Sequence, residues 1–279
     1  MKSLVLGGSA FIGRRLVEVL HAAGHSVTVL NRGLRNDGID GVDGVARLVA
    51  DRRDPASVRA ALGSTEFDAV FDVSGQVQVS SVEAIGDLVG HLEGRCGVYV
   101  FVSSIAAYAL GSGAFPWTED RPLSTSRPTA YGGHKAAVER LLAEALLVAA
   151  TVPDAIGGAF NITADAVSAL HYVHTIAGIV GIEPDIRFLP EGVAAGLRGA
   201  LPFNHRFQKV MHSVLGNERA RQELGITPRF DFAAGHRHTY EWFRAEGLDR
   251  LDGSLRDPVW GVSWDFAREA ELAATLAAP

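Results

Sequence analysis

Two side chains in the middle of the chain have the types and the spacing needed to move a proton. Tyr131 and Lys135 lie four residues apart in a stretch whose pattern predicts a helix over residues 131–145, so they share one helix face. A neighbouring ammonium stabilises a phenolate and lowers the tyrosine pKa from its ordinary value of about 10. The only other lysines are Lys2 and Lys209, which makes a chance pairing a poor explanation. The pair therefore predicts a general acid or base.

A serine in a second segment follows a predicted strand. The apolar run at residues 98–102 indicates a strand, and Ser103 and Ser104 come directly after it. Open α/β sheets bind ligands beyond the carboxyl ends of their strands, so Ser104 could hydrogen-bond a substrate carbonyl or hydroxyl. A serine in this place is also an ordinary turn residue or helix cap, and both interpretations stay open.

The start of the chain predicts a turn that binds phosphate. A short strand at residues 4–6 leads into glycines and then into a helical pattern from Leu16. This arrangement places backbone N–H groups and a helix N-terminus against a pyrophosphate. Gly7 permits the tight turn, Gly13 lets the helix pack on the strand, and Ala10 replaces the middle glycine of the motif. The residues expected to contact a dinucleotide here are Gly7, Ser9, Ala10, Phe11, Ile12 and Gly13.

Strand-like runs alternate with helical patterns through the first half of the chain. Further strands are predicted at residues 26–30, 47–50 and 69–73, and helices after Asp54 and at residues 82–92. This alternation is typical of a doubly wound parallel α/β sheet of the Rossmann type.

Beyond residue 150 the alternation loosens. We expect strands at residues 159–162 and 185–189 and a helix at residues 167–180, with the remainder mostly helical. The predicted organisation is a dinucleotide-binding domain with the catalytic residues at 1–150. A smaller, mainly helical substrate-binding part follows at 151–279.

Composition excludes several classes of protein. The net charge of -6 argues against non-specific binding to nucleic acid, which needs a basic surface. Cys96 is the single cysteine, so no disulfide framework or cysteine metal cluster is expected. His171 with His174, and His236 with His238, lack a third ligand at a diagnostic spacing, and no metal is predicted. The first predicted strand lies at the start of the chain and leaves no room for a signal peptide, and no apolar run has membrane-spanning length, so the expected location is the cytoplasm.

These motifs together resemble the extended short-chain dehydrogenases/reductases, in particular the NAD-dependent epimerase/dehydratase family. The resemblance covers residues 1–145. It implies that Tyr131 exchanges the proton, that Ser104 orients the reacting oxygen, and that Lys135 holds the nicotinamide ribose while lowering the tyrosine pKa. It places Asp51 near the adenine, although Asp51 could equally cap the next helix.

One departure from the family concerns the substrate pocket. Family members continue after the helix bearing Tyr131 and Lys135 with a strand, a tight turn and a segment that covers the substrate. Here residues 146–152 pass directly into residues 153–157, and that segment is not visible. The pocket is therefore rebuilt, open or lost.

The end of the second predicted strand bears on the choice of cofactor. NAD-binding sheets commonly place a carboxylate there, whereas this chain has Asn31 and Arg32, with Arg14 and Arg15 in the glycine turn. Available guanidinium groups favour a 2′-phosphate, so NADP is the preferred cofactor and NAD remains possible. The alternative is that these arginines are solvated surface groups. The further residues expected to bind the cofactor are Asn31, Arg32, Asp51, Ser74 and Lys135.

The favoured function is NAD(P)-dependent hydride transfer at a carbinol or carbonyl carbon of a small molecule. The net reaction is a reduction or oxidation, or a transient oxidation within an epimerase or dehydratase cycle. The alternative is a catalytically impaired, dinucleotide-binding regulatory or scaffold protein. A homodimer is a possible assembly. The aromatic group Tyr240, Trp242 and Phe243 has helical spacing and is expected in the core.

Overall fold

The structure is a computed structural model that describes residues 1–9, 11–33, 44–74, 81–109, 115–125, 158–163, 165–188, 214–226, 228–245 and 265–277. The chain divides into two compact units. The first contains residues 1–113 and 119–159, and the second contains residues 114–118 and 160–279. The cofactor role expected of residues 1–150 and the substrate role expected of residues 151–279 stay predictions.

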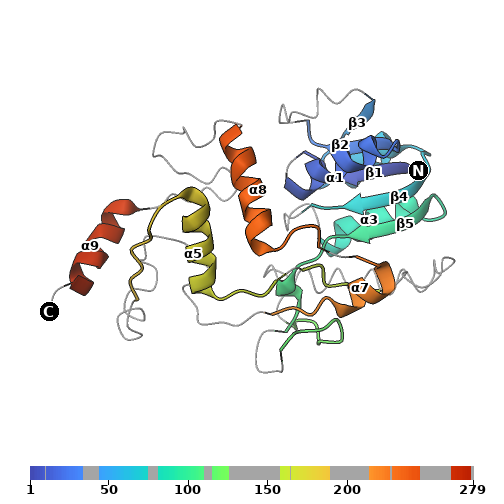
Figure 1. Cartoon of the computed structure of the whole chain (residues 1–279). Coiled ribbons are helices and arrows are strands. Elements are labelled where there is room, and N and C mark those ends of the chain that lie inside the picture. The colour runs from blue at the N-terminus through green and yellow to red at the C-terminus, as the bar shows by residue number, and fades with distance from the viewer. Residues whose placement is uncertain are drawn as a thin grey trace. The chain divides into compact units, whose positions relative to one another are not determined.

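A five-stranded parallel sheet forms the centre of the first unit (Figure 1). In spatial order the strands are β3 (Val45–Val49), β2 (Ser26–Asn31), β1 (Lys2–Leu6), β4 (Phe67–Asp72) and β5 (Cys96–Phe101). Every strand begins within two residues of the predicted position, which confirms the doubly wound α/β fold. The strand order reverses at β1, so β1 and β4 flank the switch point where such sheets bind ligands.

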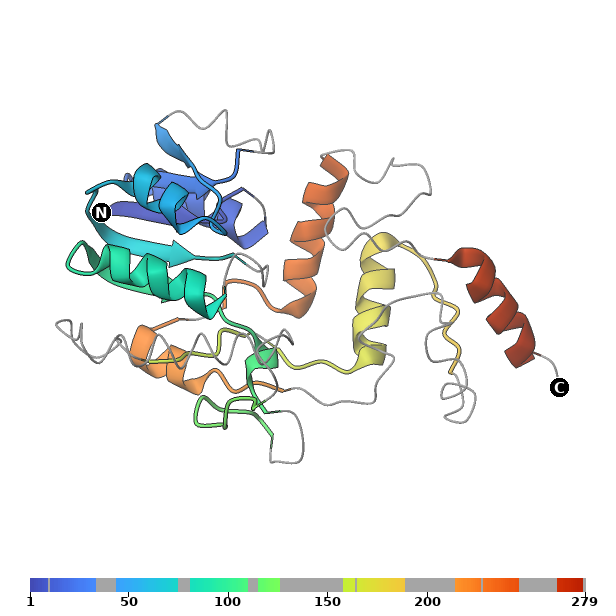
Figure 2. The ribbon, with the colours of Figure 1, turned by 180° about the vertical axis from the view of Figure 1, so that it is seen from behind.

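Helices cover both faces of the sheet because successive strand side chains point to opposite faces. Leu4 and Leu6 pack with α2 (Pro55–Leu62) and α3 (Val82–Leu92), whereas Val5 packs with Val17 of α1 (Phe11–Ala22). Figure 1 shows α1 on the near side of the sheet, and Figure 2 shows α2 and α3 side by side on the other. The helical elements of this unit among the described residues are α1 (Phe11–Ala22), α2 (Pro55–Leu62), α3 (Val82–Leu92) and the short 3-10 helix η3 (Ile105–Ala107).

Side-chain caps fix where α2 and α3 begin. The Asp54 carboxylate accepts a hydrogen bond from the backbone N–H of Ala56 at 3.0 Å, and Pro55 occupies the first turn. The Ser81 hydroxyl accepts from the N–H of Ala84 at 3.1 Å. Helix α3 covers residues 82–92, as predicted from the sequence.

In the described part of the second unit the regular elements are helices, in agreement with the expected helical character. They are α5 (Ala169–Val180), α7 (Glu218–Leu224), α8 (Phe232–Ala245) and α9 (Phe266–Ala277). Helices α5 and α8 contact each other through aromatic rings. Tyr172 lies 5.5 Å from Phe232 and 5.4 Å from His236, measured between ring centroids.

Three expectations for this half of the chain are wrong. Residues 159–162, and residues 185–188 of the strand expected at 185–189, are irregular. A strand needs a backbone ladder to a partner strand, and the sheet pairs only β1 to β5 with one another in the described residues. The Asn161 side chain instead donates to the Trp117 carbonyl at 3.1 Å. The aromatic group at residues 240–243 is not core either, since Trp242 is 48% exposed and α8 has no buried side chain.

Candidate functional site

The turn after β1 has the backbone that close approach to a ligand requires. Gly7 has a φ of +86°, a left-handed conformation that favours glycine. A Cβ at Gly13 would lie 2.2 Å from the carbonyl oxygen of Gly7 and 2.8 Å from Cγ2 of Val73. The first turn of α1 therefore lies directly on the strand end, which is the packing predicted for Gly13.

The electrostatics of this helix start suit an anion. The first turn of α1 contains no acidic side chain, so the partial positive charge of its free N–H groups is not neutralised there. Arg14 ends this turn and Arg15 follows it, but both contact Glu18, at 3.2 and 2.9 Å respectively. Both guanidinium groups are exposed. Each guanidinium group would have to break its contact with Glu18 before all of its N–H groups could bind a phosphate.

Asn31 connects the end of β2 to the glycine turn. Its Nδ2 donates to the Ser9 hydroxyl at 2.9 Å, and its Oδ1 accepts from the backbone N–H of Gly33 at 3.0 Å. The predicted site residues Ser9 and Asn31 are therefore in direct contact. The strand end carries this amide where many NAD-binding sheets have a carboxylate.

Arg32, which is exposed, and Asp51, which is half-buried, belong to one charged group at the ends of β2 and β3. The Arg53 guanidinium donates to Asp51 at 3.0 Å, and this hydrogen bond is the main reason that the Asp51 pKa falls to about 2. The charge of Arg32 lowers the same pKa further. Asp51 is therefore ionised at neutral pH. Asp54, and not Asp51, caps α2, which decides against the capping interpretation of Asp51.

A buried polar cluster at the ends of β4 and β5 was not predicted from the sequence. Arg52 and Asp72 are 7% and 0% exposed and form a bidentate ion pair, with N–O distances of 2.9 and 2.8 Å. Arg52 also donates to the Ser74 hydroxyl at 2.8 Å, and Tyr99 donates to Asp72 at 2.8 Å. Burial, together with the neighbouring Asp72 charge, raises the pKa of Tyr99 well above its ordinary value. The only feature of the sequence that could have indicated this cluster was the carboxylate of Asp72 in an otherwise apolar strand.

Ser74 adjoins the glycine turn directly. A Cβ at Gly7 would lie 3.1 Å from the Ser74 hydroxyl oxygen and 3.3 Å from its backbone nitrogen. The N–H of Val73 also donates to the carbonyl of Leu6 at 3.1 Å, across the switch point. The end of β4 thus forms one wall of the turn.

Ser104 lies three residues beyond β5, at the same edge of the sheet. Its hydroxyl accepts from the backbone N–H of Ala106 at 3.2 Å and caps η3. The helix-cap interpretation is confirmed, and a substrate contact by the same hydroxyl stays a prediction. Tyr131, Lys135 and Ala10 lie outside the described residues.

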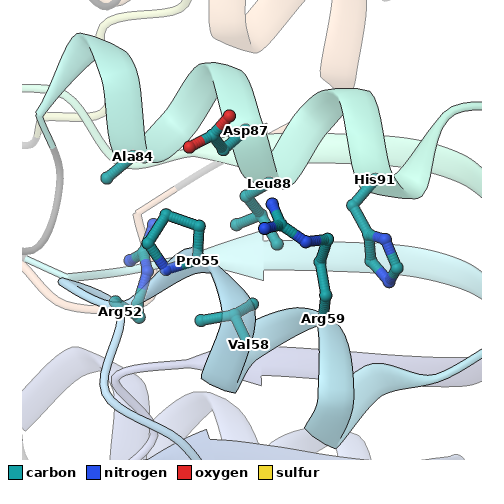
Figure 3. Close-up of a pocket in the computed structure, with 8 residues that line it drawn as sticks. All are labelled: Arg52, Pro55, Val58, Arg59, Ala84, Asp87, Leu88 and His91. Atoms are coloured by element: carbon teal, nitrogen blue, oxygen red, sulfur yellow. The ribbon is translucent and has the colours of Figure 1, made fainter.

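A small pocket among the described residues begins beside the buried cluster and runs away from it. It lies between α2 and α3, with Arg52 and Pro55 at one end and His91 at the other (Figure 3). It has room for about one water molecule, so it is too small for a substrate. In the part of the chain that the structure describes, no group of three or more His, Cys, Asp or Glu residues could hold a metal ion. None of the described helices is long and apolar enough to cross a membrane.

The comparison with known families decides the class of this protein. The model of the NAD dependent epimerase/dehydratase family matches residues 3–147, just over half of the chain. The chain belongs to this family. The match confirms the resemblance seen in the glycine turn and the Tyr131–Lys135 motif.

Curated relatives match about half of the chain. UDP-glucose 4-epimerase of Neisseria meningitidis is 32% identical over 164 residues, which cover 51% of this chain and 48% of the relative. A chloroplast stem-loop binding protein of 41 kDa from Arabidopsis thaliana is 32% identical over 130 residues, covering 43% of this chain and 33% of the relative. The chain thus spans between a third and a half of the length of these relatives.

Solved structures share the fold over most of the chain. The dTDP-glucose 4,6-dehydratase of Bacillus anthracis, solved in complex with NAD, superposes with a TM-score of 0.69 at 13% identity. The superposition covers 89% of this chain and 98% of the dehydratase. At this identity the likeness shows the fold alone.

Proposed function

We propose that the protein is an NAD(P)-dependent enzyme that transfers a hydride at a carbinol or carbonyl carbon of a sugar nucleotide. The observation that carries this proposal is the glycine turn at the switch point, closed by Gly13 on one side and Ser74 on the other. Backbone amides and an acid-free helix start at this point suit a diphosphate. Family membership supports the hydride chemistry, and relatives named for UDP- and dTDP-linked sugars support the substrate class.

The proposed roles follow the edge of the sheet. Gly7, Ser9 and Gly13 with the start of α1 would hold the diphosphate, and Asn31, Arg32 and Asp51 would face the adenosine end. The cofactor supplies the hydride acceptor or donor. Ser104 accepts a hydrogen bond from Ala106, so its own proton can be donated to the substrate oxygen. Tyr131 would exchange the proton, with Lys135 stabilising its phenolate.

Binding and turnover measurements test this proposal. We expect purified protein to bind reduced dinucleotide and to turn over a UDP- or dTDP-sugar. Tyr131→Phe should lower turnover by about 10²–10⁴-fold with cofactor affinity retained, because it removes only the proton-transferring hydroxyl. Cofactor binding with no turnover of any sugar nucleotide would favour the regulatory alternative. A wild-type rate indifferent to Tyr131→Phe would refute the catalytic assignment.

The choice between the two cofactors depends on Arg32. Because β2 ends without a carboxylate and Arg32 is exposed, we propose a preference for NADPH over NADH. Arg32→Ala should remove most of that preference. Equal affinities in the wild type, or a preference for NADH, would contradict this assignment.

A further inference from the structure

The carboxylate of Asp72 is the centre of the buried cluster at the end of β4. Asp72 accepts two bonds from Arg52, one from Tyr99 and one from the backbone N–H of Ser74 at 3.1 Å. Its two oxygens are therefore well satisfied although the side chain is fully buried. Figure 3 shows Arg52 beside Pro55, at the start of α2.

Such a cluster is weak support for stability. Removing two charges from water has a large free-energy cost, and apolar residues of similar volume often replace a buried ion pair without loss of stability. Its physical effect is geometric, since a bidentate guanidinium–carboxylate pair fixes both partners in one orientation. The residue that the pair holds is Ser74, through both its backbone N–H and its hydroxyl.

The position of Ser74 matters because it forms the wall opposite Gly7. Its hydroxyl oxygen would be 3.1 Å from a Cβ at Gly7, so the backbone of the turn and Ser74 are in close contact. The hydroxyl accepts its bond from Arg52, which directs its own proton away from the guanidinium. That proton is then available to an oxygen acceptor at the turn.

We propose that Arg52, Asp72 and Tyr99 are positioning residues that orient Ser74 against the glycine turn and thereby set the affinity for the dinucleotide. This inference rests on the proposed function, because it assumes that the turn binds a dinucleotide. Arg52 acts through Ser74 and does not itself contact the cofactor.

The test replaces the charged cluster by apolar residues of similar size. The triple variant Arg52→Met, Asp72→Leu, Tyr99→Phe leaves no buried charge unpaired, so cooperative unfolding should persist. Its Kd for NADPH and NADH, measured by nicotinamide fluorescence, should rise about 10- to 100-fold, the scale of one hydrogen bond to a charged group. Arg59→Met is the matched control. Arg59 lines the small pocket between α2 and α3 together with Arg52, but it is exposed, so its replacement should leave the Kd unchanged.

A second substitution separates positioning from a general structural effect. Ser74→Ala should weaken binding in the wild type but add little in the triple variant, because both changes remove the same contact. Amide hydrogen exchange at Gly8 in the cofactor-free protein should be faster in the triple variant than in the wild type. Additive losses, or a folded triple variant with a Kd within twofold of the wild type, would overturn the proposal.

Arg52→Lys decides the matter if the triple variant does not fold. Lysine keeps the charge but lacks the planar fork that bridges Asp72 and Ser74, so the Kd should still rise. An unchanged Kd would refute the positioning role. Absence of dinucleotide binding in the wild type would instead refute the proposed function, and this inference with it.

Discussion

Replacing Gly13 by alanine tests the central geometry of the site with a single methyl group. The added Cβ would lie 2.2 Å from the Gly7 carbonyl oxygen, whereas ordinary van der Waals contacts of a Cβ begin near 3.4 Å. Backbone must therefore move by about 1 Å, because a carbonyl of the turn cannot rotate away as a side chain can. Overpacking of this kind typically costs about 1–3 kcal/mol, and we expect the upper end of that range or more.

A glycine in another helix supplies the control for this experiment. Gly90 in α3 has no atom within 4 Å of a built Cβ, so Gly90→Ala should stabilise the protein by about 0.5–1 kcal/mol through helix propensity. Urea unfolding followed by circular dichroism should therefore separate the two variants by about 3 kcal/mol or more. Gly13→Ala should also weaken dinucleotide binding, and Gly90→Ala should not. Equal stability of the two variants would show that the contact between α1 and β1 is not rigid.

Two further predictions concern groups with shifted pKa values. Burial, with the nearby charge of Arg95, lowers the His91 pKa from its ordinary value of 6.5, so the unfolded state binds the proton more readily. The free energy of unfolding should therefore fall as pH drops below about 6.5. Urea midpoints measured at pH 8 and pH 5.5 should show a smaller loss of stability for His91→Asn than for the wild type. An identical loss in the two proteins would contradict this. Burial also raises the pKa of the Cys96 thiol, so less of the reactive thiolate is present in the native protein. Iodoacetamide should alkylate the native protein at pH 8 at least about tenfold more slowly than the urea-unfolded protein. Equal rates would refute this prediction.

The sheet and the turn could be predicted because their signals are local. Each strand of β1 to β5 is a short apolar run followed by a polar or glycine-containing segment, and α3 is preceded by a serine cap. Gly7 and Gly13 carry their geometric requirement in their residue type. The strands expected at residues 159–162 and 185–189 failed for the opposite reason. A strand requires a partner from elsewhere in the chain, which the local pattern does not contain.

The buried cluster could not be predicted from local pattern because its members come from separate elements. Arg52 follows β3 at one edge of the sheet, while Asp72 and Tyr99 lie in β4 and β5 on the other side of β1. In the sequence Arg52 is one of two adjacent arginines, and the exposed one, Arg53, pairs with Asp51 two residues away. Only the fold shows which of the two points inward.

This arrangement makes the glycine turn depend on residues outside its own motif. The motif supplies the bend at Gly7 and the close contact at Gly13, but Ser74 and Val73 provide the opposing wall. Two chains with the same glycine pattern can therefore differ in dinucleotide affinity if the end of β4 differs. For this chain that end is held by a guanidinium from the loop after β3, so a change at Arg52 should reach the proposed cofactor site through Ser74 without altering the motif.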